Sequence, residues 1–460
     1  MTYRLFLAFI FIQVALALDP SKTVTQYTHR VWQQEQGLPQ PTVYSICQTH
    51  EGYLWLGVQG HLERFDGVRF TEYDGSPGAR FGNSPVRALI EDNHHNLWIG
   101  SSGGGLTRLS GGVFTRLSGL PDDNVTSLAS DGHGNLWIGT YGGLVKLAGG
   151  HFTVYTTAQG LPTNRIRAIA IGRDGAPWVA GEDFGVAHWN GAHFERILSE
   201  PAGVHAVLSA GDGSIWVGTE QGLLRRRNGR IDSWTVAQGL PDNSILSLAE
   251  GSDGSVWIGT TSGLSRWKDG EFANYEALDG LSHSTVLSLF CDRESNLWAG
   301  TKNGLNQFLD GKVTPYTTRE GLPSNDIGPV YEDRSGHLWV GTRDAGLARF
   351  DGRRFHVLTR EHGLTGNAIS SLGEDSAGDL WVGTSAGLNR LHSGRVSATF
   401  TSRQGLPSDQ IESIFRDSRN RLWIATARGL GWMEKGRFIA APSSSGLAGK
   451  KVLSLGGGTR

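Results

Sequence analysis

The chain has 460 residues, a formal net charge of −2 and a sequence pI of about 6.7. Its charged residues are mixed along the chain without a basic stripe or a charge block, so composition argues against a nucleic-acid partner. Beyond the first 17 residues, no apolar run reaches the ~20 residues that a membrane helix needs.

Residues 1–17 have the pattern of a secretory signal peptide. Arg4 supplies the positive end, Leu5 to Ile12 form an apolar core, and Ala15-Leu16-Ala17 provides the small residues of a cleavage site. The alternative, a membrane anchor, requires a longer apolar run than this one, which Gln13 interrupts. We therefore expect export, cleavage and a periplasmic location for the mature chain.

A tetrapeptide of the type Leu-Trp-Ile-Gly returns ten times at intervals of 38 to 43 residues. Its tryptophans are Trp55, Trp98, Trp137, Trp178, Trp216, Trp257, Trp298, Trp339, Trp381 and Trp423. A period near 41 with one anchoring tryptophan per unit is typical of a β-propeller blade. Such a unit cannot bury its own faces, so each must stack on its neighbours.

One repeat, Gly239 to Tyr275, illustrates the blade. Turn residues separate four short apolar runs in it, which predict four antiparallel strands, a to d: Ile245–Leu248, Val256–Ile258, Leu264–Trp267 and Phe272–Tyr275. The second run is apolar on both faces, as expected for a sheet covered on both sides. The fold class predicted is therefore all-β, with four-stranded antiparallel blades.

The blades divide into seven and three in our preferred interpretation. Tyr27 to Trp32 aligns with strand d of later repeats, and a free N-terminal strand of this kind closes a propeller ring by completing its last blade. This predicts a seven-bladed first ring over residues 18–310 and the start of a second propeller over 311–460. A single ring of ten blades is the alternative.

The end of the sequence predicts an incomplete second propeller. Val452 to Leu455 resembles the first strand of an eleventh repeat, but no tryptophan strand follows it. We expect the chain to be the front part of a longer protein. Its open edge would favour association, so a homodimer is possible.

Two cysteines are too few for a disulfide framework. Cys47 lies eight residues before its repeat's tryptophan and Cys291 lies seven before its own, so the two are one residue out of register. Two buried thiols are the favoured interpretation.

The repeats resemble a known family. GLPDNSILSLAEGSDGSVWIGTTSGLSRW and GLPSNDIGPVYEDRSGHLWVGTRDAGLARFDG are similar to the two-component regulator propeller repeat, and the resemblance covers about residues 20 to 455. It implies a periplasmic sensor region. Family members usually carry two seven-bladed propellers, a β-sandwich, a membrane helix and a histidine kinase or diguanylate cyclase transmitter, so any membrane contact would come from segments that this chain lacks.

Three repeats depart from the pattern. His61 replaces the glycine of the Gly-Leu pair in the first repeat, Pro177 precedes the tryptophan of the fourth, and Pro201 to Gly203 has lost the Gly-Leu-Pro turn. These changes weaken individual turns without changing the assignment.

Several short motifs have structural explanations. Gly383 to Gly387 and Gly100 to Gly104 match G-x-S-x-G, but both fall on the turn between strands b and c rather than on a strand-to-helix elbow. Turn aspartates, at Asp174, Asp212 and Asp253, lack the paired arrangement that a glycosidase needs.

Two charged clusters are also explained by surface position. The pair His94-His95 has no third ligand at metal spacing, which favours solvent exposure over zinc. The basic run Arg225 to Arg227 could bind an anionic sugar, although an exposed strand is the simpler explanation. No metal, cofactor or catalytic residue is predicted.

A ligand is expected on the blade face that carries the d–a and b–c loops. Unusual residues there, with aromatic, amide and carboxylate groups suited to carbohydrate, are Tyr141, Glu182, Asp183, Phe184, Glu220, Gln221, Lys302 and Asn303. The predicted function is non-enzymatic sensing of a small molecule or oligosaccharide. A secreted propeller lyase or glycosidase and a protein-binding scaffold remain the alternatives.

Overall fold

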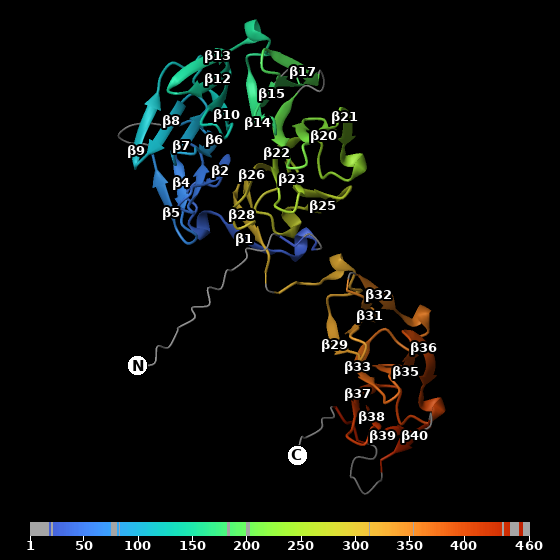
Figure 1. The fold of residues 1–460 in the computed structure, drawn as a ribbon. Helices are drawn as coiled ribbons and strands as arrows, with labels where there is room; N and C mark the ends of the chain where they lie inside the picture. The colour runs from blue at the N-terminus through green and yellow to red at the C-terminus, as the bar shows by residue number, and fades with distance from the viewer. Residues whose placement is uncertain are drawn as a thin grey trace, which may run out of the picture. The chain divides into compact units, whose positions relative to one another are not determined.

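Ten four-stranded antiparallel sheets make up the protein (Figure 1). The computed structural model describes residues 18–19, 22–74, 81, 83–181, 185–198, 203–311, 313–352, 354–434, 437–441 and 450–453, so the predicted signal peptide lies outside the described residues. The chain splits into two compact units, Met1–Thr314 and Pro315–Arg460.

The first unit holds seven blades. From inner to outer strand they are β2 (Ser45–Gln48), β3 (Leu54–Gly57), β4 (Leu62–Phe65) and β5 (Phe70–Tyr73); β6 (Val86–Glu91), β7 (Leu97–Ser101), β8 (Gly105–Ser110) and β9 (Val113–Leu117); β10 (Val125–Ser130), β11 (Leu136–Thr140), β12 (Gly143–Ala148) and β13 (His151–Tyr155); β14 (Ile166–Ile171), β15 (Pro177–Gly181), β16 (Gly185–Trp189) and β17 (Phe194–Leu198); β18 (Val204–Ser209), β19 (Ile215–Thr219), β20 (Gly222–Arg227) and β21 (Arg230–Trp234); β22 (Ile245–Glu250), β23 (Val256–Thr260), β24 (Leu264–Lys268) and β25 (Glu271–Tyr275); and β26 (Val286–Cys291), β27 (Leu297–Thr301), β28 (Gly304–Leu309) and β1 (Thr28–Trp32).

The second unit holds three blades, which adjoin in chain order through their inner strands. They are β29 (Ile327–Glu332), β30 (Leu338–Thr342), β31 (Leu347–Phe350) and β32 (Phe355–Leu358); β33 (Ile369–Glu374), β34 (Leu380–Thr384), β35 (Gly387–His392) and β36 (Arg395–Phe400); and β37 (Ile411–Arg416), β38 (Leu422–Thr426), β39 (Gly429–Glu434) and β40 (Arg437–Ala440). An eleventh inner strand was expected over Val452 to Leu455; Val452 and Leu453 are not in a strand, with Leu453 67% exposed, and Ser454 and Leu455 lie outside the described residues.

Short 3-10 turns occupy most connections from an outer strand to the next blade. They are η2 (Gln34–Gln36), η3 (Thr157–Gln159), η4 (Val236–Gln238), η5 (Ala277–Asp279), η6 (Thr318–Glu320), η7 (Arg360–His362) and η8 (Ser402–Gln404), while η1 (Val24–Gln26) precedes β1. From η2 onward, each turn ends in a glycine with φ of about +90° to +113°, as at Gly239, a left-handed conformation that glycine takes without a Cβ penalty.

The N-terminal strand supplies the outer edge of the last blade in the first unit. β1 runs antiparallel to β28, with Thr28 opposite Leu309 and Trp32 opposite Leu305. Inner strands of neighbouring blades adjoin all the way round, and β26 packs against β2. The Val43 amide donates to the Thr301 carbonyl at 3.0 Å across this junction, so seven blades form one closed ring.

A buried network ties the N-terminal segment to the sixth blade as well. The guanidinium of Arg266, only 4% exposed, donates from Nη2 to Asp253 Oδ2 at 2.7 Å and from Nη1 to the Tyr27 hydroxyl at 2.8 Å. The Asp253 carboxylate also accepts from the Ser255 amide and hydroxyl. Each charged group in this buried network therefore has a partner.

The first nine repeat tryptophans each pack beneath the following blade. Trp257, for example, lies in one apolar cluster with Val286, Leu297 and Ala299, all from the next sheet. Nine of the ten tryptophans are buried, at 1–7% exposed. Trp423 is the exception: it is only partly buried, because no further blade among the described residues packs on β38.

In five blades, an aspartate in the turn between the first two strands accepts a hydrogen bond from the indole of the repeat tryptophan. The indole Nε1–H of Trp423 donates to Asp417 Oδ2 at 2.9 Å, and four other blades make the same bond at 2.7–2.8 Å. Elsewhere the turn aspartate closes its own turn, as Asp212 does by accepting from the Ser214 amide at 2.8 Å. The turn aspartates therefore have the structural role expected for them.

The two cysteines are free thiols. Cys47 packs in a cluster with residues of the second blade, whereas Cys291 packs in the cluster that includes Trp257 of the sixth. Their offset of one residue turns them to opposite faces of adjacent sheets. Burial raises the pKa of both thiols to about 12.

Truncating repeat tryptophans should reveal which blades are covered. We expect Trp257→Ala and Trp381→Ala each to lower the free energy of unfolding by roughly 3–5 kcal/mol, because each leaves a large cavity between two blades. Trp423→Ala should cost well under half of that, because its ring is already partly exposed. Chemical denaturation of the three variants measures the difference, and equal losses at Trp381 and Trp423 would contradict this account.

Asp253 should make the stability of the first ring depend on acid pH. Burial raises the pKa of this carboxyl, but hydrogen bonds from Ser255 and Arg266 outweigh burial and hold the pKa at about 2, below its ordinary value of 3.8. A depressed carboxyl pKa stabilises the fold above the unfolded-state pKa. Its contribution is therefore complete above about pH 4 and is lost as the pH falls toward 2.

Thermal melts between neutral pH and about pH 2 test this expectation. Asp253→Asn should lower the melting temperature at neutral pH and flatten its decline in acid. Asp269→Asn, at an exposed turn, is the matched control and should change neither. An acid decline that is identical in wild type and Asp253→Asn would rule the carboxyl out as its source.

Candidate functional site

In six of the seven inner strands of the first ring, a bulge near the start of the strand directs one side chain toward the axis of the ring, whereas β2 pairs with β3 without a register shift. In β6 the ladder register shifts between Val86 and Ala88, and the residue between them is Arg87. The same shift occurs in β14 around Arg167 and in β18 around His205. A bulged residue leaves the ladder and is free to point elsewhere, here into the space enclosed by the blades.

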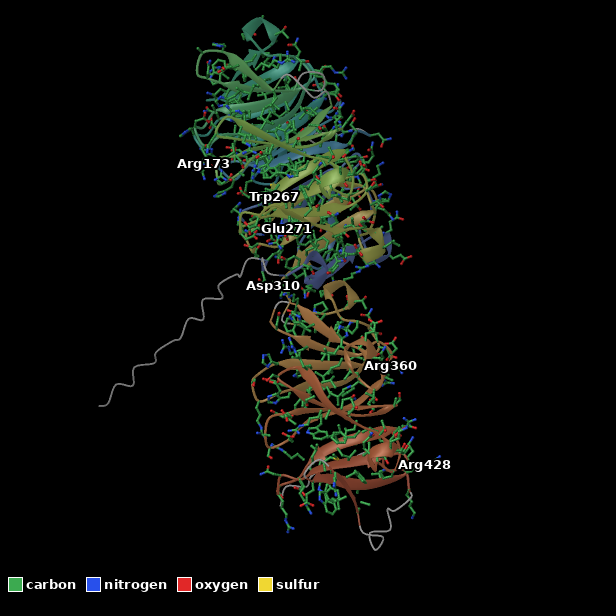
Figure 2. All side chains as sticks on the ribbon, turned by 90° about the vertical axis from the view of Figure 1, so that its right-hand side faces the viewer. Arg173, Trp267, Glu271, Asp310, Arg360 and Arg428 are labelled. Carbon is green, nitrogen blue, oxygen red and sulfur yellow. The ribbon has the colours of Figure 1, made fainter. Side chains whose placement is uncertain are left out.

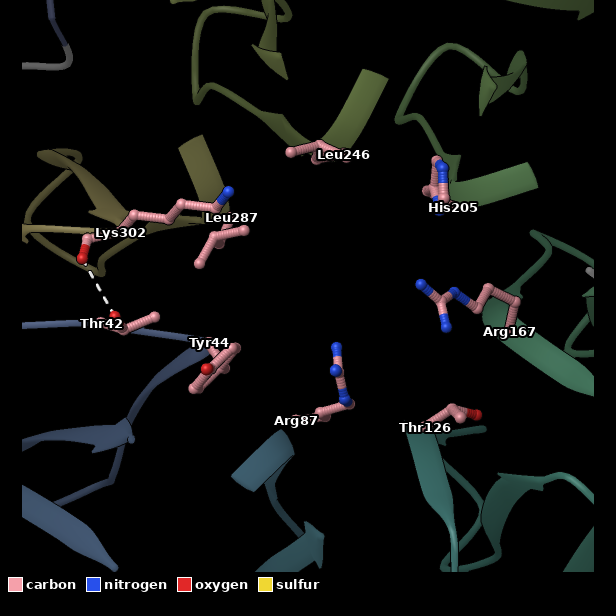
Figure 3. Close-up of a pocket in the computed structure, with 9 residues that line it drawn as sticks. All are labelled: Thr42, Tyr44, Arg87, Thr126, Arg167, His205, Leu246, Leu287 and Lys302. Atoms are coloured by element: carbon pink, nitrogen blue, oxygen red, sulfur yellow. Dashed lines mark hydrogen bonds between the residues drawn. The ribbon is translucent and has the colours of Figure 1, made fainter. Parts of the chain in front are cut away.

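These side chains line a cavity of about 470 Å³ at one end of the ring. The lining residues are Thr42, Tyr44, Arg87, Thr126, Arg167, His205, Leu246, Leu287 and Lys302 (Figure 3). Every one of the seven blades contributes its inner strand, so closure of the ring is a precondition of the pocket. The volume suits a small ligand.

The charge of the pocket is positive. Arg87 and Arg167 point into it from the second and fourth blades, and Lys302 also lines it (Figure 3). Burial lowers the pKa of Arg87, and the positive charge of Arg167 lowers it further. Among the described residues that line the pocket there is no carboxylate, so the wall offers no anion to compensate the two guanidinium groups.

Hydroxyl groups and aromatic rings hold the two arginines in place. Arg87 Nε donates to Ser102 Oγ at 2.8 Å, and its guanidinium carbon lies 5.5 Å from the centre of the Tyr44 ring. Arg167 Nη1 donates to the Tyr141 hydroxyl at 3.2 Å. These contacts orient each guanidinium without neutralising its charge.

The residues predicted from the sequence to bind a ligand are placed as follows. Lys302 lines the pocket, and its carbonyl accepts from the Thr42 hydroxyl at 3.0 Å. Tyr141 supports Arg167 from behind. The Oε1 atom of Glu220 lies 3.5 Å from the Nε2 atom of His205, which lines the pocket.

The remaining predicted residues do not line the pocket. The backbone N–H of Gln221 donates to Thr219 Oγ1 at 3.0 Å, and this hydrogen bond closes the b–c turn. The backbone carbonyl of Asn303 accepts from Gln33 Nε2 at 2.8 Å. Glu182, Asp183 and Phe184 lie outside the described residues.

Sequence reasoning missed Arg87, Arg167, His205 and Tyr44. The residues that look unusual in the sequence lie in loops, whereas these four occupy one column of the repeat, eleven residues before each repeat's tryptophan. The seven residues in that column are Tyr44, Arg87, Thr126, Arg167, His205, Leu246 and Leu287. Polar and charged residues in a column that neighbours buried Val and Ile positions are the signal that could have identified the pocket.

The other motifs are accounted for locally. In the b–c turn of Gly383 to Gly387, Thr384 Oγ1 donates to the Gly387 carbonyl at 2.9 Å, as in other blades. In the basic cluster, Arg225 Nη2 pairs with Asp232 at 2.6 Å and Arg226 lies over the Trp178 ring. Neither the G-x-S-x-G match nor the arginine run forms a site of its own.

The second unit has a pocket at the corresponding end of its three blades, with a volume of about 500 Å³. Its column residues are Gly328, Ser370 and Glu412, with Arg343 nearby. This pocket carries both charges and lacks the pair of arginines that marks the first ring.

The repeats match the model of the two component regulator propeller at residues 37–60, 80–103, 119–142, 239–262, 280–303, 321–344, 363–386 and 405–428. The chain belongs to the two-component regulator propeller family. The repeats of Trp178 and Trp216 are unmatched, and they include two of the three departures noted in the sequence, at Pro177 and at the turn before Val204. No curated protein matches the chain.

Solved structures share the fold of this two-component regulator propeller. The extracellular domain of the two-component system protein BT3049 from B. thetaiotaomicron aligns with a TM-score of 0.56 at 20% identity, over 91% of this chain and 73% of that one. The extracellular domain of BT4673 from the same organism aligns at 0.54 and 22%, over 91% and 61%. This chain therefore spans about three fifths of the length of the second domain.

A propeller enzyme is also similar in fold. Virginiamycin B lyase from Staphylococcus aureus, solved with quinupristin, aligns with a TM-score of 0.51 at 14% identity, over 62% of this chain and 99% of the lyase. At these identities the likeness shows the propeller fold alone. Within the described part of the chain, no helix is long and apolar enough to cross a membrane.

Proposed function

We propose that this chain is the ligand-sensing region of an exported signalling receptor and that the central pocket of its first ring binds a small anionic ligand, such as an acidic sugar. Its family and the extracellular domains with the same fold support the sensing role. The receptor would signal through a transmitter outside this chain. The pocket with its two arginines carries the proposal for the ligand.

The chemistry of the pocket defines the class of ligand. Arg87 and Arg167 each present a planar group that binds carboxylate or sulfate in a bidentate manner. Thr42, Thr126 and the phenol of Tyr44 add hydrogen-bonding groups at the wall. Leu246 and Leu287 supply an apolar side, against which the less polar face of a sugar ring can pack.

Binding without catalysis agrees with the charges of the pocket. Hydrolysis of a glycosidic bond needs two carboxyl groups facing each other across the bond. The described lining residues carry arginine, lysine and histidine as their charged groups and no carboxylate. We therefore expect no hydrolysis of a glycosidic bond in this pocket.

The binding test uses calorimetry with acidic and neutral oligosaccharides of matched size and with simple organic carboxylates. Acidic compounds should bind and neutral ones should not. Arg87→Gln and Arg167→Gln should each weaken binding about tenfold or more, since charge-assisted hydrogen bonds contribute about 1.5–3 kcal/mol. The melting temperature of each variant should not fall, because removal of one guanidinium relieves repulsion.

The matched control is Arg173→Gln, an exposed arginine on a turn at the other end of its blade (Figure 2). It should bind like the wild type. Equal binding of neutral sugars, or binding that both pocket variants retain in full, would contradict the anionic-ligand proposal. Release of unsaturated or shortened products during the same incubations would contradict its non-enzymatic part.

A further inference from the structure

Three potential metal ligands meet at the junction of the first and second blades. His50 lies in the turn that follows β2, and Glu91 and His95 lie at the end of β6 and in the turn that follows it. Strand a runs from the central pocket to this turn, so the cluster lies at the opposite end of the blades from the proposed ligand site. It therefore belongs to neither the pocket nor its supporting residues.

The donor atoms converge on one carboxylate oxygen. His50 Nδ1 lies 2.6 Å and His95 Nδ1 lies 4.0 Å from Glu91 Oε1, and the three donor atoms lie within 4.8 Å of one another. The two imidazole rings stack with their centres 3.8 Å apart. Both rings are accessible, with side chains 42% and 59% exposed, whereas Glu91 is only 11% exposed.

A hydrogen bond that recurs between neighbouring blades explains the position of one carboxylate oxygen of Glu91, Oε2. It does not explain the surroundings of the other oxygen, Oε1. Glu91 Oε2 accepts from the His50 amide at 2.7 Å, just as Glu250 accepts from the Gly211 amide at 2.8 Å. Arg293 lies 3.6 Å from the same Oε2 and secures it further. Holding adjacent blades together accounts for this oxygen, but it does not account for two imidazoles gathered at Oε1.

The backbone at His95 is also unusual for a histidine. His95 has φ of +62°, a left-handed conformation that costs a residue with a Cβ about 1 kcal/mol or more relative to glycine. Of the nine other turns, two have Ser295 (φ +66°) and Asn420 (φ +62°) at this position, and seven have glycine: Gly52, Gly134, Gly175, Gly213, Gly254, Gly336 and Gly378. A histidine here places an imidazole against His50 where the turn itself requires only glycine.

We propose that His50, Glu91 and His95 form a zinc site that joins the first and second blades. Two neutral imidazoles and one carboxylate are a common protein ligand set for Zn²⁺, with water in the fourth position. Tetrahedral bonds of 2.0–2.2 Å place ligand atoms about 3.3 Å apart. The His50–Glu91 pair therefore opens slightly, and the exposed His95 side chain moves inward.

The sequence alone argued against a metal site here. His94-His95 lacks a third ligand nearby in the chain, and His50 is 41 residues before Glu91. Blade stacking removes that separation, because turns one repeat apart become neighbours in space.

The test uses the full chain without a histidine tag, stripped with chelator and titrated with zinc chloride alone. We expect one zinc ion per chain and a higher melting temperature with zinc. His50→Ala and His95→Gly should each weaken zinc binding at least tenfold. His94→Ala, which changes the exposed neighbour, should bind zinc like the wild type.

His95→Gly separates a ligand from a merely structural residue. Glycine removes the left-handed strain, so this variant should melt at a higher temperature than wild type without metal while losing the further rise that zinc gives. Absence of zinc binding by the wild-type chain would overturn the proposal. So would binding that persists in His50→Ala and His95→Gly but disappears in Glu63→Gln, because it would place the ion at the separate His61–Glu63–Glu72 group.

Discussion

The covering of each blade by the next is the contact on which the rest of this protein depends, and the Trp-x-Gly element makes it. The tryptophan fills the space between two sheets, and the glycine two residues later lets the next inner strand approach. A Cβ at Gly259 would lie 2.8 Å from Val286 Cγ1, and one at Gly300 would lie 2.7 Å from Val43 Cγ1. The second pair closes the ring, so the same contact serves within the array and at its seam. Where the fourth repeat has Ala180 instead, the extra methyl is accommodated in a cluster with Val204.

The same stacking produces the two features with chemical character. At one end, seven residues, six of them at bulges, face a common axis, so the properties of the pocket are set by a single column of the repeat. At the other end, turns from successive blades touch, so side chains one repeat apart become partners. Neither position contributes to the tryptophan core. Substitution in the column or in the turns therefore changes charge and ligand chemistry at little cost to stability, which is how one scaffold can carry a cationic pocket in the first unit and a mixed one in the second.

The fold could be predicted from the sequence because its signals are local and repeated. Tryptophan period, turn glycines and apolar runs gave the four-stranded blade, and the free strand ending at Trp32 suggested how a ring is completed. The pocket could not be predicted in the same way. Whether Arg87 points into a ladder or toward the axis depends on a bulge, and that register shift is set by pairing with β7 rather than by the residues themselves. Loop residues such as Gln221 looked unusual in sequence, yet the structure uses them to close turns.

Separation of the two ends has a mechanical consequence. The pocket is lined by residues from all seven blades, so a ligand bridging Arg87 and Arg167 adds a link between the second and fourth blades to the tryptophan contacts and hydrogen bonds that join each blade to the next. The first and second blades, which provide Tyr44 and Arg87, are also the blades joined by His50 and Glu91 at the far end. A tie between the turns limits how far these two inner strands can separate at the pocket. Rigid placement of Arg87 relative to Tyr44 lowers the conformational entropy lost on binding, so order at the turn end favours recognition at the pocket end without any contact between the two sites.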